Sequence, residues 1–131
     1  MGLRERQLVR EFKEEKLPSY SAQLVEVTGG AQIAWDVDWD SFVPSEKALM
    51  YFDSQGLSTI VNAIRHICYN DLGKEAVREG LHTIEIKNFS TPGDLSVTFG
   101  DGTLVVHGAW AADSGGFPNE REVQRVLEDG L

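Results

Sequence analysis

Three carboxylates with a spacing of two residues are the side chains in this sequence whose type and arrangement best suit chemistry. They are Asp36, Asp38 and Asp40, and they alternate with apolar residues in the segment Gln32–Phe42. In an extended chain, a period of two places them on one face of a β-strand. Neighbouring carboxylates would then stand roughly 7 Å apart, so one small ion could contact them together only if the strand bent.

The acidic row allows three interpretations. The first is an ordinary solvated strand face, in which Arg65 and Arg78 supply neutralising charge. The second is a docking surface for a basic protein partner, with Trp39 at the end of the strand as an anchor. The third is a metal site, but an EF-hand loop counted from Asp36 would have Ser and Lys where Gly and Glu belong. The predicted binding residues are Asp36, Asp38, Asp40 and Trp39.

The histidines and the single cysteine show no spacing typical of a catalytic or metal site. No His-x-x-x-His or Cys-x-x-Cys pattern includes His66, His82 or His107. Cys68 stands beside apolar helix positions, which predicts a buried thiol rather than a reactive one. We therefore predict no catalytic residue, no metal and no cofactor. The alternative is a metal-assisted hydrolase that uses the acidic row with a histidine.

The net charge indicates which classes of partner the chain would bind. The 131 residues carry a formal net charge of −9. Nucleic acids and anionic membrane surfaces attract proteins through positive charge, so this balance argues against both. It favours a basic protein partner.

Cysteine usage and hydropathy bear on location. One cysteine cannot form an internal disulfide, which fits a reducing compartment. No apolar run approaches the roughly 20 residues of a membrane span, and the first residues lack the apolar region of a signal peptide. We predict a cytoplasmic protein that folds as a single domain over residues 1–131.

Helical periodicity dominates the first half of the chain. Leu3–Lys16 predicts an amphipathic helix that Pro18 stops or kinks, and Gly29 ends a second, shorter helix. The clearest helical stripe runs from Leu57 to Cys68, after an interruption at Gly56. Shorter helices are predicted around Ala48–Phe52, over Asp71–Glu79 and after Asn119.

Strand periodicity occurs over residues 32–40 and again over residues 82–111, where Asp101-Gly102 is a hairpin signal. The strands of 82–111 follow one another without helices, which predicts a three-stranded antiparallel meander. The predicted fold is therefore α+β. It has an about four-stranded, mostly antiparallel sheet (strand 32–40 plus meander 82–111), with helices packed on one face and a polar second face.

Size, acidity and the absence of a catalytic signature predict a small, non-catalytic protein-binding domain. An inhibitor or immunity-type protein that docks on a basic partner is one concrete version. The metal-assisted hydrolase is the second hypothesis. The third is a homodimer, formed through an exposed edge strand or the Leu3–Lys16 helix.

Overall fold

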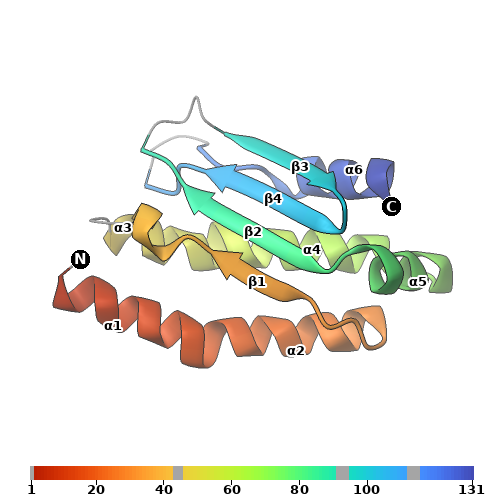
Figure 1. The fold of residues 1–131 in the computed structure, drawn as a ribbon, viewed down its shortest axis with the longest axis horizontal. Helices are drawn as coiled ribbons and strands as arrows, with labels where there is room; N and C mark the ends of the chain where they lie inside the picture. Colours follow the sequence, from red (N-terminus) through yellow and green to blue (C-terminus); the bar gives the residue numbers. More distant parts are fainter. Residues whose placement is uncertain (1, 43–45, 91–94, 112–115) are drawn as a thin grey trace.

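The computed structural model describes residues 2–42, 46–90, 95–111 and 116–131, and it packs helices against one face of a β-sheet (Figure 1). The α-helices are α1 (Leu3–Glu11), α2 (Leu17–Thr28), α3 (Glu46–Tyr51), α4 (Ser58–Ile67), α5 (Asp71–Gly80) and α6 (Glu120–Gly130). The other helical turns are the π-helical η1 (Phe12–Lys16) and η3 (Phe52–Leu57) and the 3-10 turn η2 (Trp39–Phe42). The strands are β1 (Ala34–Val37), β2 (Thr83–Asn88), β3 (Ser96–Gly100) and β4 (Thr103–Gly108).

The strands lie in the order β1-β2-β4-β3, and most of the pairing is parallel. β1 pairs with β2, and β2 with β4, in parallel; the hairpin of β3 and β4 is antiparallel. The predicted α+β class with a four-stranded sheet and helices is confirmed. The predicted mostly antiparallel sheet is wrong, and so is the meander over 82–111, because β4 lies between β2 and β3.

The helices between β1 and β2 explain the parallel pairing. Parallel neighbours need a crossover of a dozen or more residues, usually helical, because the chain must return to the same end of the sheet. The connection from Val37 to Thr83 contains α3, α4 and α5 and makes this return. Between β2 and β4 the chain instead visits the sheet edge as β3 (Figure 1).

Two predicted helix breaks occur inside continuous helices. Pro18 lies in the first turn after η1, and Gly56 lies within η3. In a π-turn a backbone N–H reaches back five residues, as from Leu17 to Phe12, and the wider turn accommodates an extra residue. Proline has no N–H to donate, and the π-turn just before Pro18 lies where the regular helical hydrogen bonding is interrupted. The predicted end at Gly29 is confirmed by its left-handed φ of 76°.

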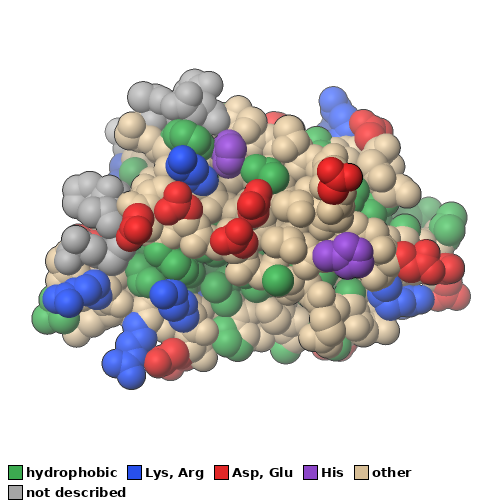
Figure 2. All heavy atoms as spheres, in the orientation of Figure 1, with side chains coloured by type: hydrophobic (Ala, Val, Ile, Leu, Met, Phe, Trp, Pro, Cys, Tyr) green, Lys and Arg blue, Asp and Glu red, His purple; other side chains and the backbone are tan. Residues whose placement is uncertain are grey.

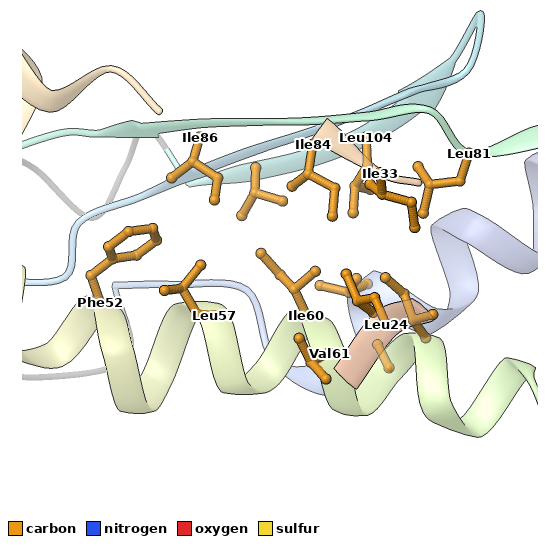
Figure 3. Close-up of a cluster of buried hydrophobic side chains, with 14 of the residues drawn as sticks. Leu24, Ile33, Phe52, Leu57, Ile60, Val61, Leu81, Ile84, Ile86 and Leu104 are labelled. Carbon is orange, nitrogen blue, oxygen red and sulfur yellow. The ribbon is translucent and has the colours of Figure 1, made fainter. Parts of the chain in front are cut away.

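The apolar stripe of the helix that ends at Ile67 packs against the inward face of the sheet. Figure 3 shows Leu57 and Ile60 on the helix side and Ile84, Ile86 and Leu104 on the sheet side. Each of these five side chains is at most 2% exposed. Burying one aliphatic side chain of this size contributes roughly 1.5–3 kcal/mol, so this contact contributes substantially to the stability of the fold.

A polar contact joins η1 and α2 to η3. The Asp53 carboxylate accepts hydrogen bonds from Lys16 Nζ and from the Tyr20 hydroxyl, each at 2.8 Å. Burial, followed by the hydrogen bond to Asp53 and its negative charge, raises the pKa of Tyr20 to about 12. The proton that this hydrogen bond requires therefore stays on Tyr20 at neutral pH.

An aromatic cluster fills one end of the core. Its members are Phe12, Trp39, Phe42, Phe52 and Trp110. The centroids of contacting rings lie between 4.9 and 6.2 Å apart. Gly56 packs against the cluster so closely that a Cβ atom there would lie 2.6 Å from a Phe52 ring carbon and 3.0 Å from Trp110 Nε1. The helix can approach the rings this closely only because residue 56 lacks a side chain.

Replacing this glycine tests the packing. We predict that Gly56→Ala lowers the free energy of unfolding by about 1–3 kcal/mol, because fully buried rings must move. Urea denaturation measures the difference. Gly100→Ala is the control, since a Cβ atom at Gly100 meets nothing within 4 Å. A Gly56→Ala variant as stable as the parent chain would contradict the close approach.

Candidate functional site

The face of the sheet that turns away from the helices is polar and, in the described part of the chain, carries no helix. The residues that point to this open face are Ala34 and Asp36 on β1, Thr83, Glu85 and Lys87 on β2, Thr103, Val105 and His107 on β4, and Ser96, Thr98 and Gly100 on β3. All are exposed or half-buried. Figure 2 shows this face, with carboxylates gathered over β1 and β2. Parallel strands are usually covered on both faces, so an open face on three parallel strands is unusual.

A pocket of about 200 Å³ lies on this face. It is lined by Asp36, Asp38, Glu85, Ile86, Lys87 and His107. The lining therefore combines three carboxylates with one ammonium group and one imidazole. Such a pocket is suited to a cationic group of limited size, since carboxylate oxygens accept hydrogen bonds from guanidinium or ammonium donors.

Asp36 and Glu85 are the central pair of this site. They are opposite each other in the parallel register of β1 and β2, and neighbouring strands stand about 4.8 Å apart. Neither carboxylate makes a hydrogen bond or an ion pair with another described residue. Like charges directly opposite each other destabilise a sheet. The fold therefore places two unneutralised carboxylates side by side at an energetic cost.

Lys87 and His107 are the next pair along the face, opposite each other on β2 and β4. Lys87 Nζ lies 5.2 Å from the centre of the Phe89 ring, and the His107 ring lies 5.1 Å from the same ring. His107 Nδ1 also lies 3.3 Å from Ser96 Oγ. The one ammonium group in the pocket lining thus sits over an aromatic ring and forms no ion pair with the carboxylates of the described residues.

The predicted acidic row ends at Asp38, because β1 is shorter than the predicted strand 32–40. The Asp38 carbonyl accepts a hydrogen bond from Ser41 Oγ at 2.5 Å, and its carboxylate accepts one from the Ser41 N–H at 3.2 Å. These bonds turn the chain into η2, so Asp40 does not line the pocket. Trp39 is half-buried, with its ring 5.6 Å from that of Phe12. The structure thus joins Asp36 and Asp38 but places Asp40 and Trp39 elsewhere.

Asn88 holds this turn in place. Its backbone N–H donates to Ser41 Oγ at 2.9 Å, and its side-chain amide donates to the Ser41 carbonyl at 3.0 Å. Its side-chain oxygen accepts a hydrogen bond from the backbone N–H of Trp110 at 3.1 Å. The side chain is 9% exposed, and such a buried amide is costly to leave unpaired. It therefore fixes the end of β2 against η2 and against the chain leaving β4.

The two arginines expected to neutralise the acidic row lie elsewhere. Arg65 donates to the side chains of Asn62 and Gln23. Arg78 donates to the Thr28 carbonyl at 2.8 Å, at the end of α2. Both arginines belong to the helical layer, so the prediction that they reach the row is wrong, and the carboxylates remain without them.

Of the three histidines and Cys68, His107 alone is in the lining of the acidic pocket. His66 Nε2 lies 2.6 Å from Glu120 Oε1 on the helical surface, and only His107 lines the pocket. Cys68 is buried as predicted, and this burial raises the pKa of its thiol. Within the described ranges, no three His, Cys, Asp or Glu side chains are arranged to hold a metal ion.

Sequence reasoning missed Glu85 and Lys87 as site residues. They alternate with Ile84 and Ile86, and that pattern indicates only a strand with one solvated face. The signal that identifies them is the parallel register, which places Glu85 beside Asp36.

Comparison of the chain with protein-family models, with curated proteins and with solved structures gave no significant match. Among the described residues, none of the helices has the length and apolarity needed to cross a bilayer. The site must therefore be interpreted from its own geometry.

Neutralising one carboxylate of the central pair tests its energetic cost. We predict that Glu85→Gln raises the free energy of unfolding by about 0.2–1 kcal/mol, because it removes the repulsion with Asp36. The gain should shrink as salt is added, since salt screens exposed charges. Urea denaturation at low and high salt measures both effects. The control is Glu15→Gln on the exposed helical surface, which should change stability little, and a Glu85→Gln variant less stable than the parent would contradict the repulsion.

Proposed function

We propose that this chain is a small acidic binding protein whose open sheet face docks on a basic protein partner. The observation that carries the proposal is the pair of unneutralised carboxylates, Asp36 and Glu85, in register on uncovered parallel strands. An inhibitor or immunity-type protein that masks a basic functional surface is one form of this function.

Charge complementarity defines the partner. The net charge of −9 attracts basic proteins over a distance, and the pocket provides a local receptor for one cationic side chain. An arginine suits it, because its planar guanidinium can bond two carboxylates at once. The surrounding Thr83, Thr98 and Thr103 hydroxyls of the open face add neutral hydrogen-bonding groups.

An ordinary solvated face explains the site less well. Solvated strand faces commonly pair opposite charges across neighbouring strands, which stabilises the sheet. Here the register opposes two carboxylates, and the arginines are bonded within the helical layer. Groups that reduce stability while remaining accessible are expected at functional surfaces, where binding compensates for the cost.

The hydrolase hypothesis has less support. It requires the acidic row to converge with a histidine, and the pocket does bring Asp36 and Asp38 near His107. Asp40 is absent from the pocket lining, and no three potential ligands in the described part of the chain are arranged around one ion. We therefore propose binding rather than catalysis. The cytoplasmic location stays a prediction from the single cysteine.

A short arginine-rich peptide tests the proposed surface directly. We predict that Asp36→Asn/Glu85→Gln weakens the binding of this peptide about five- to tenfold in isothermal titration calorimetry, because two exposed charge pairs are lost. Binding to the parent chain should weaken as salt is added.

The control is a double variant with the same net charge as Asp36→Asn/Glu85→Gln, but it leaves the pocket intact. Glu15→Gln/Glu128→Gln removes two exposed carboxylates from the helical side and also changes the net charge from −9 to −7. It should keep nearly all of the parent affinity. Equal losses in the two double variants would mean that affinity follows net charge alone, and the open face would lose its assigned role.

A further inference from the structure

The core of the sheet is incomplete along β3. The inward side chains of the two central strands are fully buried, as Ile84 and Leu104 are at 0% exposure. On β3 the corresponding residues are Val97 and Phe99, and both are only half-buried. Apolar residues that face the core but remain partly in water lose some of the free energy that full burial provides. α6 packs against the inward side of β3, where Gly130 lies against the Phe99 ring. The apolar layer nevertheless reaches the edge of the sheet with Val97 and Phe99 partly in water.

Among the residues that the structure describes, no strand pairs with the outer side of β3. β3 and β4 are joined by a two-residue turn in which Asp101 and Gly102 both have positive φ, the type I′ hairpin. In such a hairpin the residues flanking the turn exchange hydrogen bonds, and along the strand every second residue does so. Gly100 and Thr98 therefore form hydrogen bonds with β4. The backbone N–H and C=O groups of Phe99 and Val97 point away from β4.

The strand lacks the features that usually protect an edge. Natural edge strands carry lysines, prolines, bulges or a covering segment that prevents pairing with another chain. Ser96–Gly100 contains no charged residue and no proline, and its register with β4 is continuous, without a bulge. Figure 1 shows β3 as the outermost strand of the sheet, with α6 near its C-terminal end. A further strand can therefore approach in the plane of the sheet.

We propose that β3 pairs antiparallel with β3 of a second copy of this chain, with Thr98 opposite Thr98 of the second copy. In this register Val97 is opposite Phe99 of the second copy, and these are the residues with outward N–H and C=O groups. Each pair of Val97 with Phe99 of the second copy exchanges two hydrogen bonds. The two-fold axis generates a second, identical pair. The two sheets join into one continuous sheet.

A second copy fits this edge better than a chain of different sequence because the edge is self-complementary. An aromatic residue beside a β-branched residue is a favourable cross-strand pair, and the two-fold register supplies it on both sides of the axis. The strand itself is neutral, so the charge of −9 resides on other elements. Salt should therefore strengthen the dimer, since it screens repulsion between two acidic copies. The open faces of both copies then lie on the same side of the joined sheet, so the dimer leaves the acidic pocket accessible.

Cysteine substitution on the exposed face of β3 tests the register. In the proposed pairing the two Thr98 Cα atoms stand about 4.5 Å apart, which lies within the range for a disulfide. We expect Thr98→Cys to form a covalent dimer on mild oxidation. Ser96→Cys is the matched control, because its two copies would stand about 14 Å apart along the strands. The natural Cys68 is buried, so the parent chain should remain uncrosslinked.

Sedimentation velocity over a roughly hundredfold range of concentration tests the association itself. The edge is small, so a weak dimer is expected, with a fraction that rises with concentration and with salt. Thr98→Lys should abolish the dimer, because two like charges would meet at the two-fold axis, although this change reduces the negative net charge from −9 to −8. Thr83→Lys, on an interior strand of the same face and with the same charge, should retain it.

Three results would overturn the proposal. They are a parent chain that stays monomeric at every concentration and salt, equal crosslinking of Thr98→Cys and Ser96→Cys, and a dimer that persists in Thr98→Lys. None of these results depends on the peptide binding that tests the acidic face, so the two proposals can fail separately.

Discussion

The fold depends on the burial of one apolar surface between a single helical layer and a single face of the sheet. Leu57 and Ile60 pack on Ile84, Ile86 and Leu104, and each of these side chains is almost completely excluded from water. Alternation along a strand then dictates the other face. Because every inward position of β2 and β4 is committed to the core, Glu85, Lys87 and His107 must project outward. The chemistry of the open face is thus a consequence of how the core is packed.

Parallel pairing gives that face its particular charge distribution. The crossover from β1 to β2 sets the register in which Asp36 stands opposite Glu85. The turn held by Asn88 and Ser41 then removes Asp40 from the row and places Asp38 at the rim of the pocket. Two carboxylates that stand opposite each other and form no ion pair with a described residue lower the stability of the sheet. In the binding role that we propose, a basic group in the pocket would offset this cost.

The helices and strands could be predicted from the sequence more fully than the pairing of the strands. The period of the Leu57–Cys68 stripe, the left-handed end at Gly29 and the hairpin at Asp101-Gly102 are local signals, and the structure confirms them. The helix predicted after Asn119 is another, and it begins as α6 with a capping box formed by Asn119 and Glu122.

Strand order depends on contacts between segments far apart in the chain, so alternation within 82–111 could not show that β4 pairs with β2. The helices between β1 and β2 were the available signal for parallel pairing. The site shared this limit, because Asp36 could be identified from its own strand, whereas Glu85 becomes its neighbour only through the register. Pro18 and Gly56 suggested helix breaks for a different reason. A π-turn lies just before Pro18 and another contains Gly56, so both helices continue past these residues.

The most direct test of the central claim, that the open sheet face receives a basic partner, is the location of contact in solution. Titration of the isotopically labelled chain with an arginine-rich peptide, followed by amide chemical shifts, reports that location residue by residue. The account predicts salt-sensitive shifts concentrated on β1 and β2 around Asp36 and Glu85. Shifts confined to the helical layer, or spread evenly over all exposed carboxylates, would contradict it.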